Sequence, residues 1–223
     1  GYLPEERGLY TTSRVLETLV YFGALKGLSS DTATHWALEY LEKVDLLDKA
    51  NLEIKKLSSG QQQKIQLGIT IINSPELLIL DEPTKGLDPL NRTLLMDILL
   101  DLNKNGSTII FVTHQMEEVE KIADRLVMIK NGQRKLYGEV ETVKQQFGTN
   151  TLHIRFEGEI PQNPQLYSAH IENRSATITP VGDTDPNMIV AYLIKNNVTL
   201  QRLEVSAPSL HDIFIEISQQ HDA

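Results

Sequence analysis

The chain has 223 residues, of which 40% are hydrophobic and 23% are charged, and these values are close to those of ordinary globular proteins. Its 21 basic and 30 acidic residues give a formal net charge of −9, which argues against a dedicated nucleic-acid-binding protein because such proteins usually carry a basic surface. The chain has no cysteine, so disulfides and thiol chemistry are excluded. No apolar run approaches the length that a transmembrane helix needs, and none is predicted.

Residues 9–56 are predicted to be mainly helical. Apolar residues between Leu16 and Leu25 indicate an amphipathic helix that ends near Gly27. Asp31 is the expected N-cap of a second helix. The apolar face predicted for that helix consists of Trp36, Leu38, Leu41 and Val44.

Short strands then alternate with helices. Leu77–Leu80 is an unbroken apolar run, which fits a strand buried on both faces of a parallel sheet, and Thr108–Val112 fits a second buried strand. Helices are predicted between them at about 89–103 and after them at 115–123. This alternation predicts an α/β sheet with right-handed crossovers.

The last part of the chain is predicted to be a small α+β domain. Before this domain, still in the α/β part, a hairpin is expected between residues 126–129 and 133–137, with Asn131-Gly132 as its tight turn. Gly148–Asn150 is the predicted boundary before the domain. Strands are then expected at 151–156, 169–171, 176–178 and 199–205, and helices at 186–195 and from the cap Ser209 to 218.

Four short motifs that carry chemistry follow one another in a fixed order. They are LSSGQ at residues 57–61, LLILDEP at 77–83, GLDP at 86–89 and Thr-His at 113–114. In LLILDEP two carboxylates emerge at the carboxyl end of a predicted parallel strand, which is where α/β proteins bind ligands. Asp81 is predicted to hold Mg²⁺, and Glu82, pointing the other way in extended backbone, to polarise a water for attack on a phosphate.

The LSSGQ motif precedes a helix predicted from about 61 to 72. Hydroxyls and backbone N–H groups of Ser58, Ser59, Gly60 and Gln61 would lie at the positive end of this helix and form an anion site. An ordinary helix N-cap is the simpler alternative for this motif taken alone.

Three further residues have both a functional and an ordinary interpretation. His114 follows a predicted strand on the same sheet edge as Asp81, so it can contact a γ-phosphate or orient the attacking water, or it can be a plain loop histidine. Asp88 can bind nucleotide or simply start the helix after Pro89. Glu5 can be a metal ligand or a surface acid.

The order and spacing of the four motifs resemble the nucleotide-binding subunit of ATP-binding-cassette (ABC) transporters. LSSGQ is similar to that family's signature, LLILDEP to its Walker B motif, GLDP to its D-loop and His114 to its switch histidine. The resemblance implies a partial P-loop NTPase core with a helical signature subdomain and a small α+β C-terminal domain. The implied divisions are 1–74, 75–148 and 149–223.

The resemblance also implies how these residues act. Glu82 and His114 would be catalytic, Asp81 and Glu5 would hold Mg²⁺, and Ser58–Gln61 with Asp88 would contact ATP held by a second subunit. ATP and Mg²⁺ are the implied cofactors, and a transmembrane permease and a second ATP-binding subunit are the implied partners. The chain would then be cytoplasmic and peripheral on the inner face of the cell membrane. Its first ten residues and its last domain resemble the bacterial sodium- and drug-exporter branch.

The sequence departs from the family pattern at four places. No G-x-x-x-x-G-K-[ST] P-loop motif occurs in the 223 residues, so we expect a fragment that is inactive alone. Glu5 stands where the family's Q-loop has glutamine, and Ser59 replaces the first of two signature glycines. Lys85 precedes the D-loop where serine is usual.

Two other functions remain open from the sequence. A cassette ATPase that acts on ribosomes or DNA, without transport, would share the motifs, although the net charge of −9 argues against it. The last domain can alternatively be a regulatory or dimerising module, which is compatible with the ATPase hypothesis.

Overall fold

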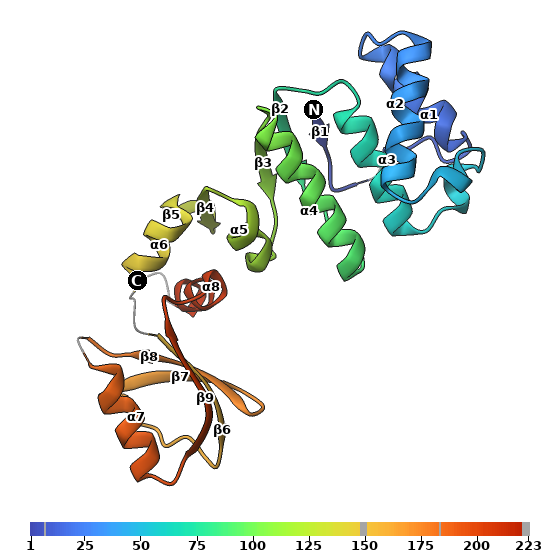
Figure 1. The fold of residues 1–223 in the computed structure, drawn as a ribbon. Coiled ribbons are helices and arrows are strands. Elements are labelled where there is room, and N and C mark those ends of the chain that lie inside the picture. Colours follow the sequence, from blue (N-terminus) through green and yellow to red (C-terminus); the bar gives the residue numbers. More distant parts are fainter. Residues whose placement is uncertain (7, 148–150, 183, 220–223) are drawn as a thin grey trace. The chain divides into compact units, whose positions relative to one another are not determined.

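The computed structural model describes residues 1–6, 8–147, 151–182 and 184–219 (Figure 1). It separates into two compact units, Gly1–Gln115 and Met116–Ala223. The predicted boundary at Gly148–Asn150 lies outside the described residues. The division predicted at residues 74 and 148 follows motifs rather than packing and stays a prediction. None of the helices in the described ranges combines the length and the apolar composition that crossing a bilayer requires.

The first unit contains a three-stranded parallel sheet of order β1-β2-β3. Its strands are β1 (Tyr2–Leu3), β2 (Leu77–Asp81) and β3 (Thr108–Val112). Its α-helices are α1 (Val15–Leu25), α2 (Ser30–Lys43), α3 (Ser59–Ile71) and α4 (Pro89–Lys104), and 3₁₀ turns cover Leu47–Lys49 and Ile54–Lys56. The predicted alternation of strands and helices is confirmed. Because β2 and β3 are parallel, with Asp81 opposite Val112, the residues that follow both strands lie at one edge of the sheet.

Burial on both faces of the central strands, as predicted, is wrong for this unit. In β2, Leu78 and Leu80 are fully buried, whereas the side chains that alternate with them are exposed. The exposed row consists of Leu77, Ile79, Ile110 and Val112, which are 45%, 40%, 52% and 56% exposed. An apolar run therefore gave the correct strands but overstated how many of their faces are covered.

The cap predicted for α2 is wrong, and its predicted apolar face is confirmed at Leu41 and Val44, which are buried, but not at Leu38, which is 37% exposed. Ser29, not Asp31, is the N-cap, and its hydroxyl accepts a hydrogen bond from the Thr32 N–H at 3.1 Å. The side chains that α2 buries are Ala33, Ala37, Tyr40 and Leu41. Small residues form the contact because the helices approach closely: a Cβ added at Gly23 of α1 would lie 2.8 Å from the Ala33 Cβ.

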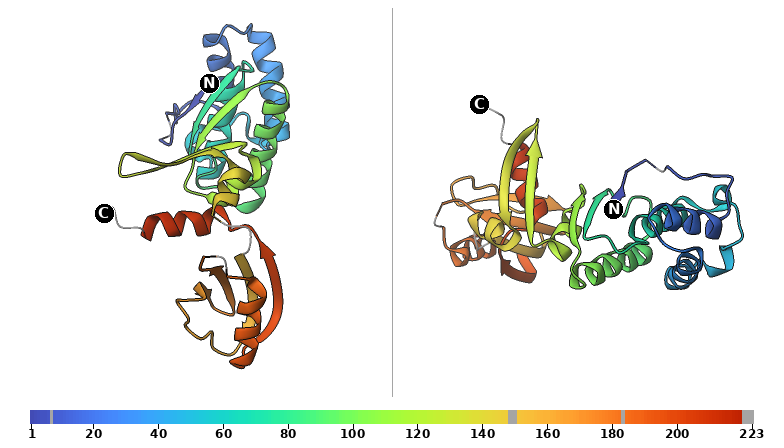
Figure 2. Two further views of the ribbon diagram at one scale, coloured as in Figure 1. Left: turned by 90° about the vertical axis from the view of Figure 1, so that its left-hand side faces the viewer. Right: turned by 90° about the horizontal axis from the view of Figure 1, so that it is seen from above.

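The second unit begins with a helix, a hairpin and a second helix. They are α5 (Met116–Ile122), β4 (Arg125–Lys130), β5 (Gln133–Glu139) and α6 (Val140–Gln146). The predicted hairpin is confirmed, and Asn131 and Gly132 at its turn have the positive φ values, 51° and 73°, that such a tight turn requires. Both views of Figure 2 show it as a two-stranded ribbon. Helix α6, which the sequence analysis did not predict, packs with α8 (Leu210–Gln219) around Met128.

The second unit also contains a four-stranded antiparallel sheet of order β7-β8-β6-β9. Its strands are β6 (Thr151–Glu157), β7 (Tyr167–Glu172), β8 (Ser175–Pro180) and β9 (Thr199–Ser206). Helix α7 (Pro186–Lys195) covers one face, where Ile189 and Leu193 join Leu152 and Ile154 of β6 in a buried core (Figure 1). This arrangement confirms the predicted small α+β domain.

Candidate functional site

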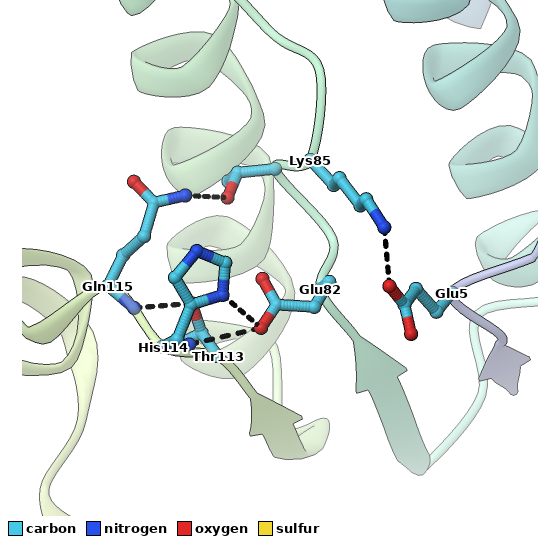
Figure 3. A network of polar contacts seen from close by, with 7 residues as sticks. Glu5, Glu82, Lys85, Thr113, His114 and Gln115 are labelled. Carbon is cyan, nitrogen blue, oxygen red and sulfur yellow. Dashed lines mark hydrogen bonds and ion pairs between the residues drawn. The ribbon is translucent and has the colours of Figure 1, made fainter.

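The predicted catalytic residues lie together at the carboxyl ends of β2 and β3 (Figure 3). Asp81 is the last residue of β2, and Glu82 follows it; His114 lies two residues after β3. The Glu82 N–H donates to the Val112 carbonyl at 2.9 Å, so the sheet's hydrogen bonding continues one residue beyond β2. The neighbouring strand ends thus place Glu82 beside His114, as the parallel order predicts.

Glu82 has one bound and one unpartnered carboxylate oxygen. Its Oε1 accepts a hydrogen bond from the His114 N–H at 3.0 Å and lies 2.7 Å from His114 Nδ1. Its Oε2 is buried and has no hydrogen-bond partner among the described residues. The Glu82 side chain is only 13% exposed, whereas that of His114 is 78% exposed. A held, desolvated carboxylate with one free oxygen is suited to accept a proton from a water.

The backbone predicted at Glu82 is wrong. Glu82 is not extended but has φ 46°, in the left-handed region that costs a non-glycine residue about 1–2 kcal/mol. The chain turns immediately after Asp81, and this turn brings the Glu82 carboxylate to His114. Strained backbone of this kind is often found at functional sites.

Glu5 lies in the same region and forms an ion pair with Lys85 (Figure 3). The hydrogen bond and the charge of Lys85 lower the pKa of the Glu5 carboxyl below its ordinary value, and the nearby His114 lowers it further. Glu5 is therefore ionised at neutral pH. Lys85, which the sequence analysis noted only as a departure from the family pattern, offsets the charge that Glu5 adds.

The donor chemistry of these acids fits a magnesium ion. Asp81 and Glu5 supply carboxylate oxygens, and Glu5 is held in its ionised form. Within the described ranges no group of three or more His, Cys, Asp or Glu side chains forms a metal cluster. Mg²⁺ does not require one, because it usually keeps several waters and binds through one or two carboxylates and substrate phosphates.

The LSSGQ residues form the first turn of α3, with Ser58 as the N-cap. The Ser58 hydroxyl accepts from the Gln61 N–H at 3.2 Å, and the Gln61 side-chain carbonyl accepts from the Ser58 N–H at 2.9 Å. Both side chains therefore make a reciprocal capping box. The ordinary N-cap interpretation is correct for Ser58, and the predicted anion site would rest on the N–H groups of Ser59 and Gly60.

The GLDP segment, residues 86–89, lies against this first turn. A Cβ added at Gly60 would lie 3.2 Å from the Gly86 carbonyl oxygen, so only glycine fits there without a shift. Asp88 caps α4 by accepting from the Asn91 N–H at 3.0 Å, and hydrogen bonds from Asn91 lower its pKa. In the described part of the chain, no hydrogen bond or ion pair joins Ser58, Gln61 or Asp88 to Glu82 or His114.

The sequence analysis missed two glutamines of α3 that hold the acidic segments. Gln63 Nε2 donates to the Pro83 carbonyl at 3.0 Å, and Gln66 Nε2 donates to the Pro4 carbonyl at 3.1 Å. Pro83 follows Glu82, and Pro4 precedes Glu5. Both glutamines are buried, at 2% and 5% exposure. The sequence offered one signal for these two residues: Gln63 and Gln66 are polar and lie three positions apart in a helix with many buried positions, and buried polar side chains need hydrogen-bond partners.

Two family descriptions match the chain. Residues 138–218 match "ATP-binding protein DrrA1-3-like, C-terminal domain". Residues 6–120 match "AAA domain, putative AbiEii toxin, Type IV TA system".

Individual proteins match most of the chain. An uncharacterized ABC transporter ATP-binding protein of Bacillus subtilis, YhaQ, is 34% identical over 218 residues, which are 97% of this chain and 73% of the relative. Nod factor export ATP-binding protein I of Bradyrhizobium diazoefficiens is 32% identical over 222 residues, which are 98% of this chain and 71% of the relative. A solved structure described as an ATP binding subunit of an ABC transporter has a TM-score of 0.61 and 28% identity, covering 66% of this chain and 61% of that chain.

Proposed function

Because the chain belongs to the family of ABC transporter ATP-binding proteins, we propose that its strand-end site hydrolyses ATP and so powers a separate membrane permease. ATP binding and hydrolysis are properties of the family. The observation that carries the proposal is the Glu82 carboxylate, which His114 holds by one oxygen while the other oxygen is buried and unpartnered.

In this proposal each strand-end residue has one task. Glu82 Oε2 accepts a proton from the water that attacks the γ-phosphate, and His114 keeps the carboxylate in place. Asp81 and Glu5 would hold Mg²⁺, which would supply positive charge against the phosphates. Ser58–Gln61 and Asp88 contact ATP that a second copy of the subunit holds, which agrees with the lack of hydrogen bonds, among the described residues, from Ser58, Gln61 and Asp88 to Glu82 or His114.

The proposed activity requires a P-loop, and the 223 residues contain no G-x-x-x-x-G-K-[ST] sequence. Backbone N–H groups and the lysine of a P-loop supply most of the attraction for a triphosphate. We therefore expect the 223 residues alone to be inactive, and the proposed reaction to need a P-loop supplied with them.

An exposed aromatic cluster on the first unit supports docking to a permease at the inner face of the membrane. Tyr10 stacks on Phe22 with ring centroids 6.1 Å apart, and Tyr21 packs edge-on to both. Tyr10 and Tyr21 are nevertheless 58% and 50% exposed, and exposed aromatic groups of this kind are typical of interaction surfaces. The Nod factor export relative favours export as the direction of transport.

The proposal is tested in a chimera in which the P-loop segment of an ABC ATP-binding relative is joined before Gly1. In that protein Glu82→Gln should lower ATP turnover by roughly 10²–10⁴-fold and leave ATP binding intact, because it removes the proton acceptor and keeps the side-chain shape. Glu42→Gln, at an exposed position of α2, is the matched control and should turn over ATP normally. Normal turnover by Glu82→Gln would contradict the assignment.

A further inference from the structure

The four-stranded sheet of the second unit has a second face that α7 does not cover. Leu152 and Ile154 of β6 point into the core that α7 closes. Side chains of a strand alternate between the two faces, so His153 and Arg155 point outward. This outward face takes no part in the proposed ATPase site.

Two rows of side chains cross the outward face from strand to strand. The first row is His170, Thr177, His153 and Glu204, and the second is Glu172, Ser175, Arg155 and Arg202. All eight residues line one hollow of about 360 Å³. The outward face is therefore a concave surface made of polar and ionisable groups.

The pairing of Arg155 with Arg202 distinguishes this face from an ordinary solvated sheet. The two arginines are direct register partners across β6 and β9, and like charges at such positions destabilise a sheet. Glu204 pairs with Arg202 at 3.1 Å. Arg155 makes no ion pair with any residue that the structure describes. Arg155 thus has no ion-pair partner among the described residues while it lies opposite a second guanidinium.

The neighbours of the two arginines leave donors at the centre of the hollow. Glu172 is engaged by His170 at 3.3 Å, at one edge of the sheet. Ser175 of β8 is the register partner of Arg155 on one side, and Arg202 of β9 is its partner on the other side. The Ser175 hydroxyl is therefore a third donor next to the two arginines. A guanidinium offers paired N–H donors that match the oxygens of phosphate, and a phosphate has enough acceptor oxygens for two guanidinium groups and a hydroxyl.

We propose that this outward face, centred on Arg155 and Arg202, is a binding site for a phosphate group, carried by a small soluble molecule or by a lipid headgroup. The bound anion balances the two opposed guanidinium groups. Binding of this kind would give the second unit a ligand-sensing role separate from ATP hydrolysis, so the proposal stands whether or not the ATPase assignment does.

The test uses the 223-residue chain and inorganic phosphate, with chloride at equal ionic strength to account for screening. Phosphate should bind saturably and raise the melting temperature, and Arg155→Gln should weaken binding at least about tenfold, as expected for a lost charge-assisted hydrogen bond. Arg134→Gln is the matched control because this substitution removes the same charge at a site away from the hollow. Arg134 lies in the hairpin, over the ring of Tyr137 and 5.7 Å from its centroid. Without phosphate, Arg155→Gln should not lower the melting temperature, because it removes a like-charge contact.

Vesicles distinguish the two sources of the phosphate group. Cosedimentation with phosphatidic acid vesicles but not with phosphatidylcholine vesicles, lost in Arg155→Gln, assigns a lipid headgroup; binding of inorganic phosphate alone assigns a soluble ligand. Amide shifts in the wild-type chain should map to residues 153, 155, 177 and 202, which requires no variant to fold. Equal effects of phosphate and chloride, equal binding by both variants, or shifts confined to other residues would each overturn the proposal.

Discussion

At the scale of single residues, the site depends on the backbone conformation of Glu82 and on the ion pair of Glu5 with Lys85. The backbone of Glu82 leaves the strand conformation at φ 46°, and its carboxylate contacts His114. Glu5 is kept ionised by Lys85, and together they form a neutral pair. Both residues are departures from the family pattern, so the two departures compensate each other in charge. The two acids therefore differ: one is buried with a free oxygen, and the other is exposed and paired.

Lys85→Met should raise the pKa of Glu5 toward its ordinary value, because Lys85 is the main cause of its lowering. A carboxyl whose folded pKa is lowered contributes stability above its unfolded pKa and loses it as the pH falls through the folded value. The variant should therefore lose a small stability advantage at neutral pH and not in strong acid. Carboxyl NMR titration of Glu5 measures the shift.

Lys55→Met is the matched control for this measurement. Lys55 pairs with Glu53 as Lys85 pairs with Glu5, and it lowers the Glu53 pKa in the same way. Lys55→Met should raise the pKa of Glu53 and leave that of Glu5 unchanged. A Glu5 titration that is indifferent to Lys85→Met would show that the ion pair is absent in solution.

Gly68→Ala should destabilise the first unit. A Cβ at Gly68 would lie 2.5 Å from Cε1 of Tyr40, whose ring is buried and whose hydroxyl donates to the Lys64 carbonyl at 2.6 Å. Overpacking of this kind costs about 1–3 kcal/mol, and the better helix propensity of alanine offsets up to ~1 kcal/mol. Urea unfolding measures the difference, with Gly8→Ala, which meets nothing within 4 Å, as the control. Equal stability of both variants would mean that the ring moves aside.

At the scale of elements, α3 connects the LSSGQ motif to both acidic segments. Its first turn is closed by the capping box of Ser58 and Gln61. One and two turns later, Gln63 and Gln66 hold the carbonyls beside Glu82 and Glu5. A displacement of α3 would therefore shift the backbone next to both Glu82 and Glu5.

Gln66→Leu should release the segment of residues 1–6 without unfolding the unit. The substitution removes the donor to the Pro4 carbonyl, but Gln66 Oε1 is itself buried without a partner in the described chain, so the net loss of unfolding free energy should be about 1 kcal/mol or less. Hydrogen exchange in residues 1–6 should accelerate. Gln62→Leu, which loses bonds to the Ile54 and Leu57 carbonyls instead, should leave that exchange unchanged. Acceleration by both variants would argue against a specific tie.

Much of the element order followed from local sequence, whereas contacts between elements did not. The hairpin was predictable because Asn131-Gly132 has a strong turn preference. The Ser58 cap followed from the same kind of local rule. The Glu82 backbone and the Glu5–Lys85 pair were not predictable, because both depend on residues far apart in the chain. The choice between Ser29 and Asp31 as cap turned on two residues, which is within the usual uncertainty of a helix end.

At the scale of the whole molecule, the motifs assigned to ATP chemistry belong to the first unit and the outward arginines to the second. No sheet is shared between the described parts of the two units, and each unit has its own buried side chains. Nucleotide chemistry and the proposed phosphate-group recognition can therefore be tested separately in one chain.

Titration calorimetry of the Arg155→Gln variant of the 223-residue chain, in which the proposed phosphate-group site is weakened, should show no Mg-ATP binding in the micromolar range. Asp81 and Glu82, the acids at the end of β2, repel a triphosphate, and no P-loop motif in the 223 residues offsets them. The chimera with an added P-loop is the positive control. Micromolar binding that Arg155→Gln leaves intact would reveal a nucleotide site in the first unit that needs no P-loop.

The exposed row of Leu77, Ile79, Ile110 and Val112 has a practical consequence for handling the protein. Neighbouring branched side chains on this exposed sheet face form a surface that adheres to other apolar surfaces, including a second molecule. At the concentrations used for calorimetry or NMR, we expect reversible clustering and retention on hydrophobic resins. Threonine at residues 79 and 110 would keep the β-branched shape that suits strands and make the purified protein easier to concentrate.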